Sequence, residues 1–247
     1  MYRLPAYHIL KTRRRSWLAA YLCCLLFLLA ACGGGGNSST PDAHTILKNA
    51  QAAIQKVKSY HFTLKGQNIS PNSKLPITSA DGDLLVPDKL RATGTVIFSG
   101  NNLQVQLVVI GNQQYINLLG AWQTTSGLLD PRALTDSKTG IAGILGHIQN
   151  PSTPTDSSVN GQACWNITGK LDPNYLSGLT GGGAPPGTLD DISTCIGKSD
   201  NLPYQIIVTG IATQGDTSKT VRTLTLSHFN EQITITAPTA SALTHSV

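Results

Sequence analysis

The sequence predicts an α+β protein in which an antiparallel sheet curves around a few helices. Three observations carry this prediction. An apolar stripe at helical spacing comes first, segments that alternate apolar and polar residues follow, and later helical segments give way to more strands. Runs of strands joined by short turns are typical of an antiparallel sheet with one apolar face, and helices on that face complete the fold.

The N-terminus is predicted to be an export signal covering residues 1–31. It begins with a basic, acid-free region, continues with the apolar run 17–31, and ends in the small residues Ala30 and Ala31 before Cys32. The apolar run is shorter than the roughly 20 residues that a spanning helix needs, so an uncleaved anchor helix is the less favoured alternative. We expect cleavage before Cys32, lipid on its thiol, and a lipid-anchored protein on the extracytoplasmic face of the cell membrane. The sequence leaves open whether the general secretory or the twin-arginine route is used.

Cleavage of this signal changes the charge of the protein. The signal carries five of the 18 basic residues and none of the 13 acidic residues, so 13 of each sign remain. No basic surface is left to neutralise phosphates, and we expect no nucleic-acid partner. The remaining chain is long enough for a single domain with a real core. We predict a lipidated Cys and flexible tether at 32–41, one domain at 42–238 and a disordered tail at 239–247.

The first element of the domain is predicted to be a helix. Thr40 is expected to cap it, with Pro41 at its first position, and it is expected to run to about Lys58. Its apolar stripe consists of Ile46, Leu47, Ala50, Ile54 and Val57.

From Tyr60 onward the apolar spacing changes from helical to alternating, which predicts a meander of strands. Turn signals such as Asp81-Gly82 and Gly111-Asn112 separate these strands. After a turn at Asp130-Pro131, the pattern alternates between helices and strands. The predicted elements are strands near 60–65, 95–98 and 103–107, a helix at 139–150, a strand at 162–169, a short helix at 172–179, a loop at 181–187, and strands at 204–210, 220–228 and 231–237.

The cysteines predict one disulfide. Cys23 and Cys24 leave with the signal and Cys32 takes the lipid, so Cys164 and Cys195 remain. Two cysteines in an exported domain are expected to pair. A metal site is the weaker alternative, because the pair lacks ligand-like spacing and neighbouring histidines.

The sequence carries no recognisable catalytic motif, and we expect a protein that is not an enzyme and uses no cofactor. It contains neither a nucleophile elbow nor a phosphate-binding loop. The histidines are scattered, so no metal site is predicted. The Asp81-Gly82-Asp83 segment lacks the further ligands of a calcium loop. Asp190 and Asp191 would face opposite sides of a strand, so they do not form a carboxylate pair.

The apolar face of the predicted sheet must be covered by helices or by a ligand. If the sheet curves strongly, the helices leave a cavity, and if it does not, they fill the core. The residues alone do not separate these two possibilities.

Four stretches give the chain a resemblance to a known family. They are Val57-Lys58-Ser59-Tyr60-His61-Phe62 after the first helix, Ala80-Asp81-Gly82-Asp83 ahead of Val86-Pro87 and residues 93–98, Val108-Val109-Ile110-Gly111-Asn112-Gln113-Gln114-Tyr115 ahead of Trp122, and Leu224-Thr225-Leu226-Ser227-His228-Phe229-Asn230 with the residues to Pro238. In these stretches the chain resembles the LppX/LprA/LprF/LprG family of acylated bacterial lipoproteins, over about residues 43–238. The Cys164/Cys195 pair and the loop at 181–187 depart from the family pattern and leave the mouth of the cavity undefined.

The resemblance implies a half-open antiparallel β-barrel with helices over its concave side, similar to the LolA/LolB carriers. It implies an anchored lipoprotein that holds the acyl chains of phospholipids or glycolipids in an apolar cavity and carries them across the cell envelope. An envelope transport protein is the expected partner. An envelope sensor or protein-interaction module with the same fold is the alternative. The expected cavity-lining residues are Phe62, Leu64, Val96, Phe98, Leu107, Val109, Ile144, Leu145, Ile206, Val208, Leu224 and Leu226.

Overall fold

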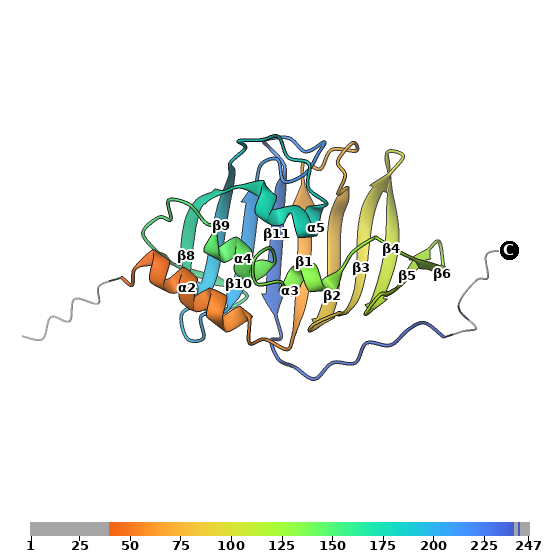
Figure 1. Cartoon of the computed structure of the whole chain (residues 1–247), viewed down its shortest axis with the longest axis horizontal. Coiled ribbons are helices and arrows are strands. Elements are labelled where there is room, and N and C mark those ends of the chain that lie inside the picture. The colour runs from red at the N-terminus through yellow and green to blue at the C-terminus, as the bar shows by residue number, and fades with distance from the viewer. Residues whose placement is uncertain (1–39, 240–241, 243–247) are drawn as a thin grey trace, which may run out of the picture. The chain divides into compact units, whose positions relative to one another are not determined.

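The computed structural model describes residues 40–239 and residue 242 (Figure 1). The predicted signal peptide, Cys32, the tether up to residue 39 and most of the tail lie outside the described residues. The described residues belong to one compact unit, Thr40–Val247, which contains two hydrophobic clusters and a disulfide.

The centre of the fold is one open antiparallel sheet of 11 strands, and helices lie over one of its faces (Figure 1). This confirms the predicted α+β class. The strand order is β6-β5-β4-β3-β2-β1-β11-β10-β9-β8-β7, so two meanders meet where β1 pairs with β11. The strands are β1 (Ser59–Gln67), β2 (Ile77–Leu85), β3 (Lys89–Phe98), β4 (Asn101–Ile110), β5 (Gln113–Leu118), β6 (Ala121–Thr125), β7 (Thr155–Val159), β8 (Gln162–Leu171), β9 (Asp190–Gly197), β10 (Pro203–Thr209) and β11 (Val221–Ser227).

The helices are short and most begin with an aspartate cap. Asp42, Asp130 and Asp172 each accept a hydrogen bond from a backbone N–H two or three residues later. Proline follows two of these caps directly, where its missing N–H costs nothing. The helices are α2 (Ala43–Ile54), α3 (Pro131–Thr135), α4 (Ile141–Gly146), the 3-10 helix η1 (Pro173–Leu176) and α5 (Ser177–Thr180).

Two predicted helices had wrong boundaries. The first is capped by Asp42 rather than Thr40 and ends at Ile54 rather than near Lys58. The helix expected at 139–150 is reduced to α4, because the backbone of Gln149 pairs with that of Lys170 on β8. In both cases a nearby polar or backbone group offers better hydrogen bonds than a longer helix would.

Two further predictions are wrong: Asp81 and Gly82, expected to form a turn, lie in the middle of β2, and the strand predicted at 231–237 is absent. Residues 231–237 are extended but join no sheet. Ile233 and Ile235 instead pack on the face of the sheet opposite the helices, against Val108 and Tyr115 among others. Packing on that surface produces the same alternation in the sequence as a strand, without a ladder of backbone hydrogen bonds.

Most of the main core lies between the helices and the facing side of five strands, β1 and β8–β11, and we call these strands with the helices over them the covered half. On each of these strands, alternate side chains point to the helices, and Ile167, Ile192, Ile196 and Leu226 are at most 2 % exposed. Leu84, Leu90 and Val109, towards one end of β2, β3 and β4, belong to the same core. The predicted disulfide is present: Cys164 on β8 and Cys195 on β9 are bonded, with their Cα atoms 5.4 Å apart. It joins neighbouring strands on the face away from the helices.

Candidate functional site

The inner face of the sheet, which is the face that carries the helices, continues beyond them over β2–β6. We call these five strands the bare half, because Figure 1 shows no helix over β3–β6. Its residues continue rows that begin on β1 and cross the sheet, since partners in an antiparallel pair share a face. One row contains Phe62, Gly82, Ala92, Leu107 and Ile116. The next contains Leu64, Ala80, Gly94, Val105 and Leu118.

These two rows are apolar and only partly covered. Apart from the buried Gly82, every member is half-buried, and none carries a charged or hydrogen-bonding side chain. Val96 and Leu103, which face each other at the end of β3 and β4, extend the surface. We call the two rows together with Val96 and Leu103 the open inner face.

Small residues occupy the middle of the open inner face. Gly82 and Ala80 on β2 lie beside Ala92 and Gly94 on β3, with longer side chains on β1 and β4 to either side. A Cβ atom at Gly82 would come within 2.8 Å of the Ala92 Cα atom, so only glycine fits there. The small side chains of β2 and β3 therefore form a low strip, and the longer side chains of β1 and β4 project further from the sheet on either side of it.

A loop closes one end of the open inner face. The Gln114 side chain on β5 donates from Nε2 to the Leu129 carbonyl at 2.9 Å and accepts from the Leu128 N–H at 3.0 Å. These bonds hold the segment between β6 and α3 over the end of the strands where Leu90 and Val109 are buried. The rows beyond this end remain partly exposed.

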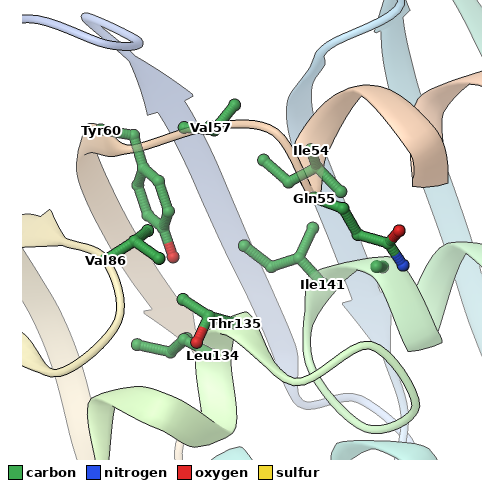
Figure 2. Close-up of a pocket in the computed structure, with 9 residues that line it drawn as sticks. Ile54, Gln55, Val57, Tyr60, Val86, Leu134, Thr135 and Ile141 are labelled. Atoms are coloured by element: carbon green, nitrogen blue, oxygen red, sulfur yellow. The ribbon is translucent and has the colours of Figure 1, made fainter.

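The covered half contains a small pocket rather than a ligand cavity. Figure 2 shows it between the end of α2, the start of β1, α3 and α4. Its volume is about 50 Å³, whereas ligand pockets usually measure roughly 300–1,000 Å³. A pocket of this size has room for a few water molecules. Its lining residues are Ile54, Gln55, Val57, Tyr60, Val86, Leu134, Thr135, Ile141 and Ala142.

Tyr60 gives this pocket one polar atom. Its side chain is buried, and its hydroxyl lacks a hydrogen-bond partner among the described residues and points towards Thr135 in Figure 2. Burial raises the pKa of the Tyr60 phenol, so the hydroxyl stays protonated. The pocket therefore suits a small hydrogen-bond acceptor and not an acyl chain.

A wider depression of about 540 Å³ lies on the outer side of α2, open to solvent. Polar and charged groups such as Asn49, Lys56 and Asp200 contribute to its lining. It does not offer the continuous apolar contact that the open inner face provides.

The predicted cavity-lining residues all lie on the inner side of the fold, but in three different settings. Six are in the packed core: Val109, Ile144, Leu145, Ile206, Val208 and Leu226. Five are half-buried on the inner face: Phe62, Leu64, Val96, Leu107 and Leu224. Phe98, at the end of β3, is 67 % exposed.

Apart from the small residues of β2 and β3, sequence reasoning missed four apolar residues of the open inner face, namely Leu103, Val105, Ile116 and Leu118. Leu103 and Val105 lie on the same face of the predicted strand 103–107 as Leu107, so the alternation that selected Leu107 also applies to them. Ile116 and Leu118 were missed because β5 was not predicted. Pairing 113–118 with β4 across the Gly111-Asn112 turn would have placed both beside Leu107 and Val105.

The opposite face carries an ionic cluster. His61 Nδ1 donates to Asp83 Oδ1 at 2.9 Å, and Arg91 Nη2 donates to Asp83 Oδ2 at 2.7 Å. Burial raises the pKa of Asp83, but the hydrogen bonds from His61 and Arg91 outweigh it, so the pKa lies below its ordinary value. These contacts connect β1, β2 and β3.

Within residues 40–239 and 242, no group of three or more His, Cys, Asp or Glu is arranged to hold a metal ion. None of the helices described in the structure is long and apolar enough to cross a membrane.

Comparison with known sequences gives consistent matches. The family model described as LppX_LprAFG lipoprotein matches residues 42–235. Lipoprotein LprA of Mycobacterium tuberculosis is 25 % identical over 207 residues, covering 81 % of this chain and 83 % of LprA. The protein named lipoarabinomannan carrier protein LprG from Mycobacterium leprae is 26 % identical over 211 residues, covering 81 % of this chain and 84 % of LprG.

Solved structures share the fold. LprF of Mycobacterium bovis superposes with a TM-score of 0.66 at 19 % identity, covering 81 % of this chain and 99 % of LprF. Lipoprotein LppX of Mycobacterium tuberculosis superposes with a TM-score of 0.59 at 20 % identity, covering 80 % of this chain and 100 % of LppX. The open sheet with helices on one face is thus the architecture of these lipoproteins.

Proposed function

Because this chain belongs to the LppX_LprAFG lipoprotein family, we propose that it is a lipid carrier that catalyses no reaction. It binds the acyl chains of phospholipids or glycolipids on the open inner face and carries them across the cell envelope. The family match covers nearly the whole described domain, so the proposal concerns the domain as a whole.

The open inner face is the observation that carries this proposal. Soluble proteins seldom leave large contiguous apolar patches in water, and such patches usually mark binding sites. Each acyl methylene moved from water onto an apolar surface contributes up to about 0.8 kcal/mol. The low strip along β2 and β3, between longer side chains on β1 and β4, suits a long and narrow apolar ligand. The headgroup would remain outside, because this face offers it no polar partner.

The relatives support the same class of ligand. The Mycobacterium leprae relative is named a lipoarabinomannan carrier protein. At 26 % identity this name supports a carrier role and leaves the headgroup of the ligand undefined.

The predicted anchor fits this role. Lipid on Cys32 and the tether at 32–41 would keep the domain beside the extracytoplasmic face of the membrane, where a carrier collects its ligand. An envelope transport protein would then be the partner that delivers or receives the lipid.

The test compares two lysine substitutions on one strand. Residues 40–247 are purified without acylation, extracted, and examined for bound lipid by mass spectrometry. Val105→Lys places a charge on the open inner face and should reduce bound lipid about tenfold or more, because the ammonium loses hydration beside an acyl chain. Gln106→Lys, exposed on the opposite face of β4, is the matched control and should bind lipid like the unmodified chain.

Reproducible absence of bound lipid, with no uptake of added lipid, would reject the carrier proposal. It would favour the second candidate, an envelope sensor or interaction module that binds a protein on the same apolar face. The filled core of the covered half supports that candidate, because it leaves an exposed patch rather than an enclosed cavity.

A further inference from the structure

Two hairpin tips project from the same end of the bare half. Ser99-Gly100 joins β3 to β4, and Leu119-Gly120 joins β5 to β6. In both tips the two linking residues have positive φ, with values of 50° and 80° in the first and 54° and 89° in the second. Two-residue loops of this kind favour Asn, Asp or Gly at their first position.

Leu119 does not fit the tip that it occupies. A φ of 54° is unfavourable for leucine. Because the Leu119 side chain is 89 % exposed, packing contributes almost nothing to offset this backbone cost. The hairpin between β7 and β8 has Asn160-Gly161 at the same positions. The other non-glycine residues with positive φ in the described chain are all Asn, Ser or His. Neither the turn nor the core accounts for leucine at this position.

The neighbouring tip is apolar as well. Phe98, the last residue of β3, is 67 % exposed and belongs to the inner-face side of that strand. Residues 98–102 and 118–122 contain no charged side chain. Single exposed apolar residues are common, but two large ones on adjacent uncharged tips form a local apolar corner.

Three lysines lie at the same end of the sheet as this corner. Lys65, Lys74 and Lys219 are exposed, and none forms a salt bridge among the described residues. The loop that holds Lys74 contacts the end of β3 where Ile97 N–H donates to the Pro76 carbonyl at 2.9 Å.

Lys219 is joined to the same loop, because Asn68 Nδ2 donates to the Lys219 carbonyl at 2.8 Å. The acidic residue nearby in the chain, Asp216, is buried against Arg222 and cannot offset these charges at the surface. One exposed carboxylate, Asp81 on β2, lies diagonal to Lys65 and 3.4 Å from His61, so the three lysines outnumber the exposed acidic side chains at this end of the sheet.

We propose that the two hairpin tips and the three lysines dock the protein on the surface of an anionic phospholipid bilayer. Leu119 and Phe98 enter the interfacial region, and the lysines attract the phosphate headgroups. The proposal rests on the carrier function for its purpose, because the open inner face ends at these tips. Docking would bring that face to the bilayer, so that an acyl chain enters it without crossing water.

The experiment measures sedimentation of residues 40–247 with vesicles of phosphatidylcholine alone or mixed equally with phosphatidylglycerol. We expect binding to the mixed vesicles that weakens about tenfold in Leu119→Asn, which corresponds to about 1.4 kcal/mol. Leu128→Asn is the matched control, since Leu128 is also exposed but lies at the other end of β5. It should bind vesicles like the unmodified chain.

Two further measurements test the separate parts of the proposal. Lys74→Gln should weaken binding about fivefold on the mixed vesicles and leave binding to phosphatidylcholine unchanged, because its contribution is electrostatic. Leu119→Asn should unfold at the same temperature as the unmodified chain or higher, because asparagine tolerates positive φ better than leucine. A weakened vesicle contact therefore cannot be attributed to misfolding.

Uptake of a fluorescent fatty acid in the absence of vesicles measures ligand binding separately from docking on the bilayer. If the unmodified chain takes up the fatty acid but does not sediment with vesicles, or if Leu119→Asn sediments equally well, docking is overturned and the carrier function stands. If the unmodified chain sediments with the vesicles but takes up no fatty acid, docking stands and the carrier function fails. A dimer in solution that Leu119→Asn dissociates, without vesicle binding, would show that the tips bind a second copy and would also overturn docking.

Discussion

The covered and bare halves belong to one sheet and use the same alternation of residues, yet they bury their inner faces differently. In the covered half, Ile167 on β8 and Leu226 on β11 are at most 1 % exposed beneath the helices. In the bare half, Val105 on β4 and Leu118 on β5 are half-buried, because no helix lies over them. The difference therefore lies in what covers the strands and not in the strands themselves.

This contrast separates stability from ligand binding within one domain. The disulfide, the buried ion pair between Arg222 and Asp216, and most of the large core side chains belong to the covered half. That half supplies a packed support next to strands whose inner apolar side chains remain partly exposed. Substitutions in the two halves should consequently affect different measurements.

The largest loss of stability is expected from Asp216→Asn. The carboxylate of Asp216 is fully buried, pairs with Arg222 and accepts the Ser73 hydroxyl at 2.7 Å. Removing its charge leaves the guanidinium of Arg222 buried without a counter-charge, which costs about 3–5 kcal/mol. Urea unfolding followed by tryptophan fluorescence would measure the free energy of unfolding.

The matched control is Asp191→Asn, which breaks the exposed ion pair with Lys170. Exposed pairs contribute about 0–1 kcal/mol, so its free energy of unfolding should change little. Equal losses in the two variants would contradict the assignment of the buried pair as a main support of the covered half.

A pair of truncations tests the two halves directly. Ile167→Ala leaves a cavity in the packed core and should lower the free energy of unfolding by about 2–5 kcal/mol. Leu118→Ala shortens a side chain that is only half-buried, and should cost less than about 1 kcal/mol. If Leu118→Ala destabilised as much as Ile167→Ala, the inner face of the bare half would be core and not a binding surface.

Local patterns predicted much of the fold. The apolar stripe from Ile46 to Ile54 identified α2, and alternation from Tyr60 identified β1. The pairing of Cys164 with Cys195 followed from counting the cysteines left after cleavage. These features depend on neighbours in the sequence or on composition, so no knowledge of the tertiary structure was needed.

Features that depend on distant contacts were harder to predict. Ile233 and Ile235 alternate like strand residues, but they pack onto a face of the sheet and do not pair with a neighbouring strand. The division of the sheet into two halves depends on where the short helices lie, and no residue of β4 or β5 indicates that. For the same reason, sequence reasoning placed Val109 and Phe98 in one site, although the structure buries the first and exposes the second.

The smallest expected effect concerns acid stability in the bare half. Hydrogen bonds from His61 and Arg91 hold the pKa of Asp83 below its ordinary value of 3.8 despite its partial burial. A lowered pKa in the folded state stabilises the protein above the unfolded value, and this contribution is lost as the pH falls through the folded value. Stability should therefore decline below about pH 4, in part because Asp83 becomes protonated.

Asp83→Asn should be slightly less stable than the unmodified chain near neutral pH and should lose less stability on acidification. Arg91→Gln removes one of the two donors and should raise the pKa of Asp83, which NMR titration of the carboxyl carbon would measure. If Asp83→Asn showed the same acid sensitivity as the unmodified chain, the acid-sensitive group would lie elsewhere. The ionic cluster on the opposite face would then contribute little to the bare half, whose strands would be held together by backbone pairing and by the packing of Ile233 and Ile235.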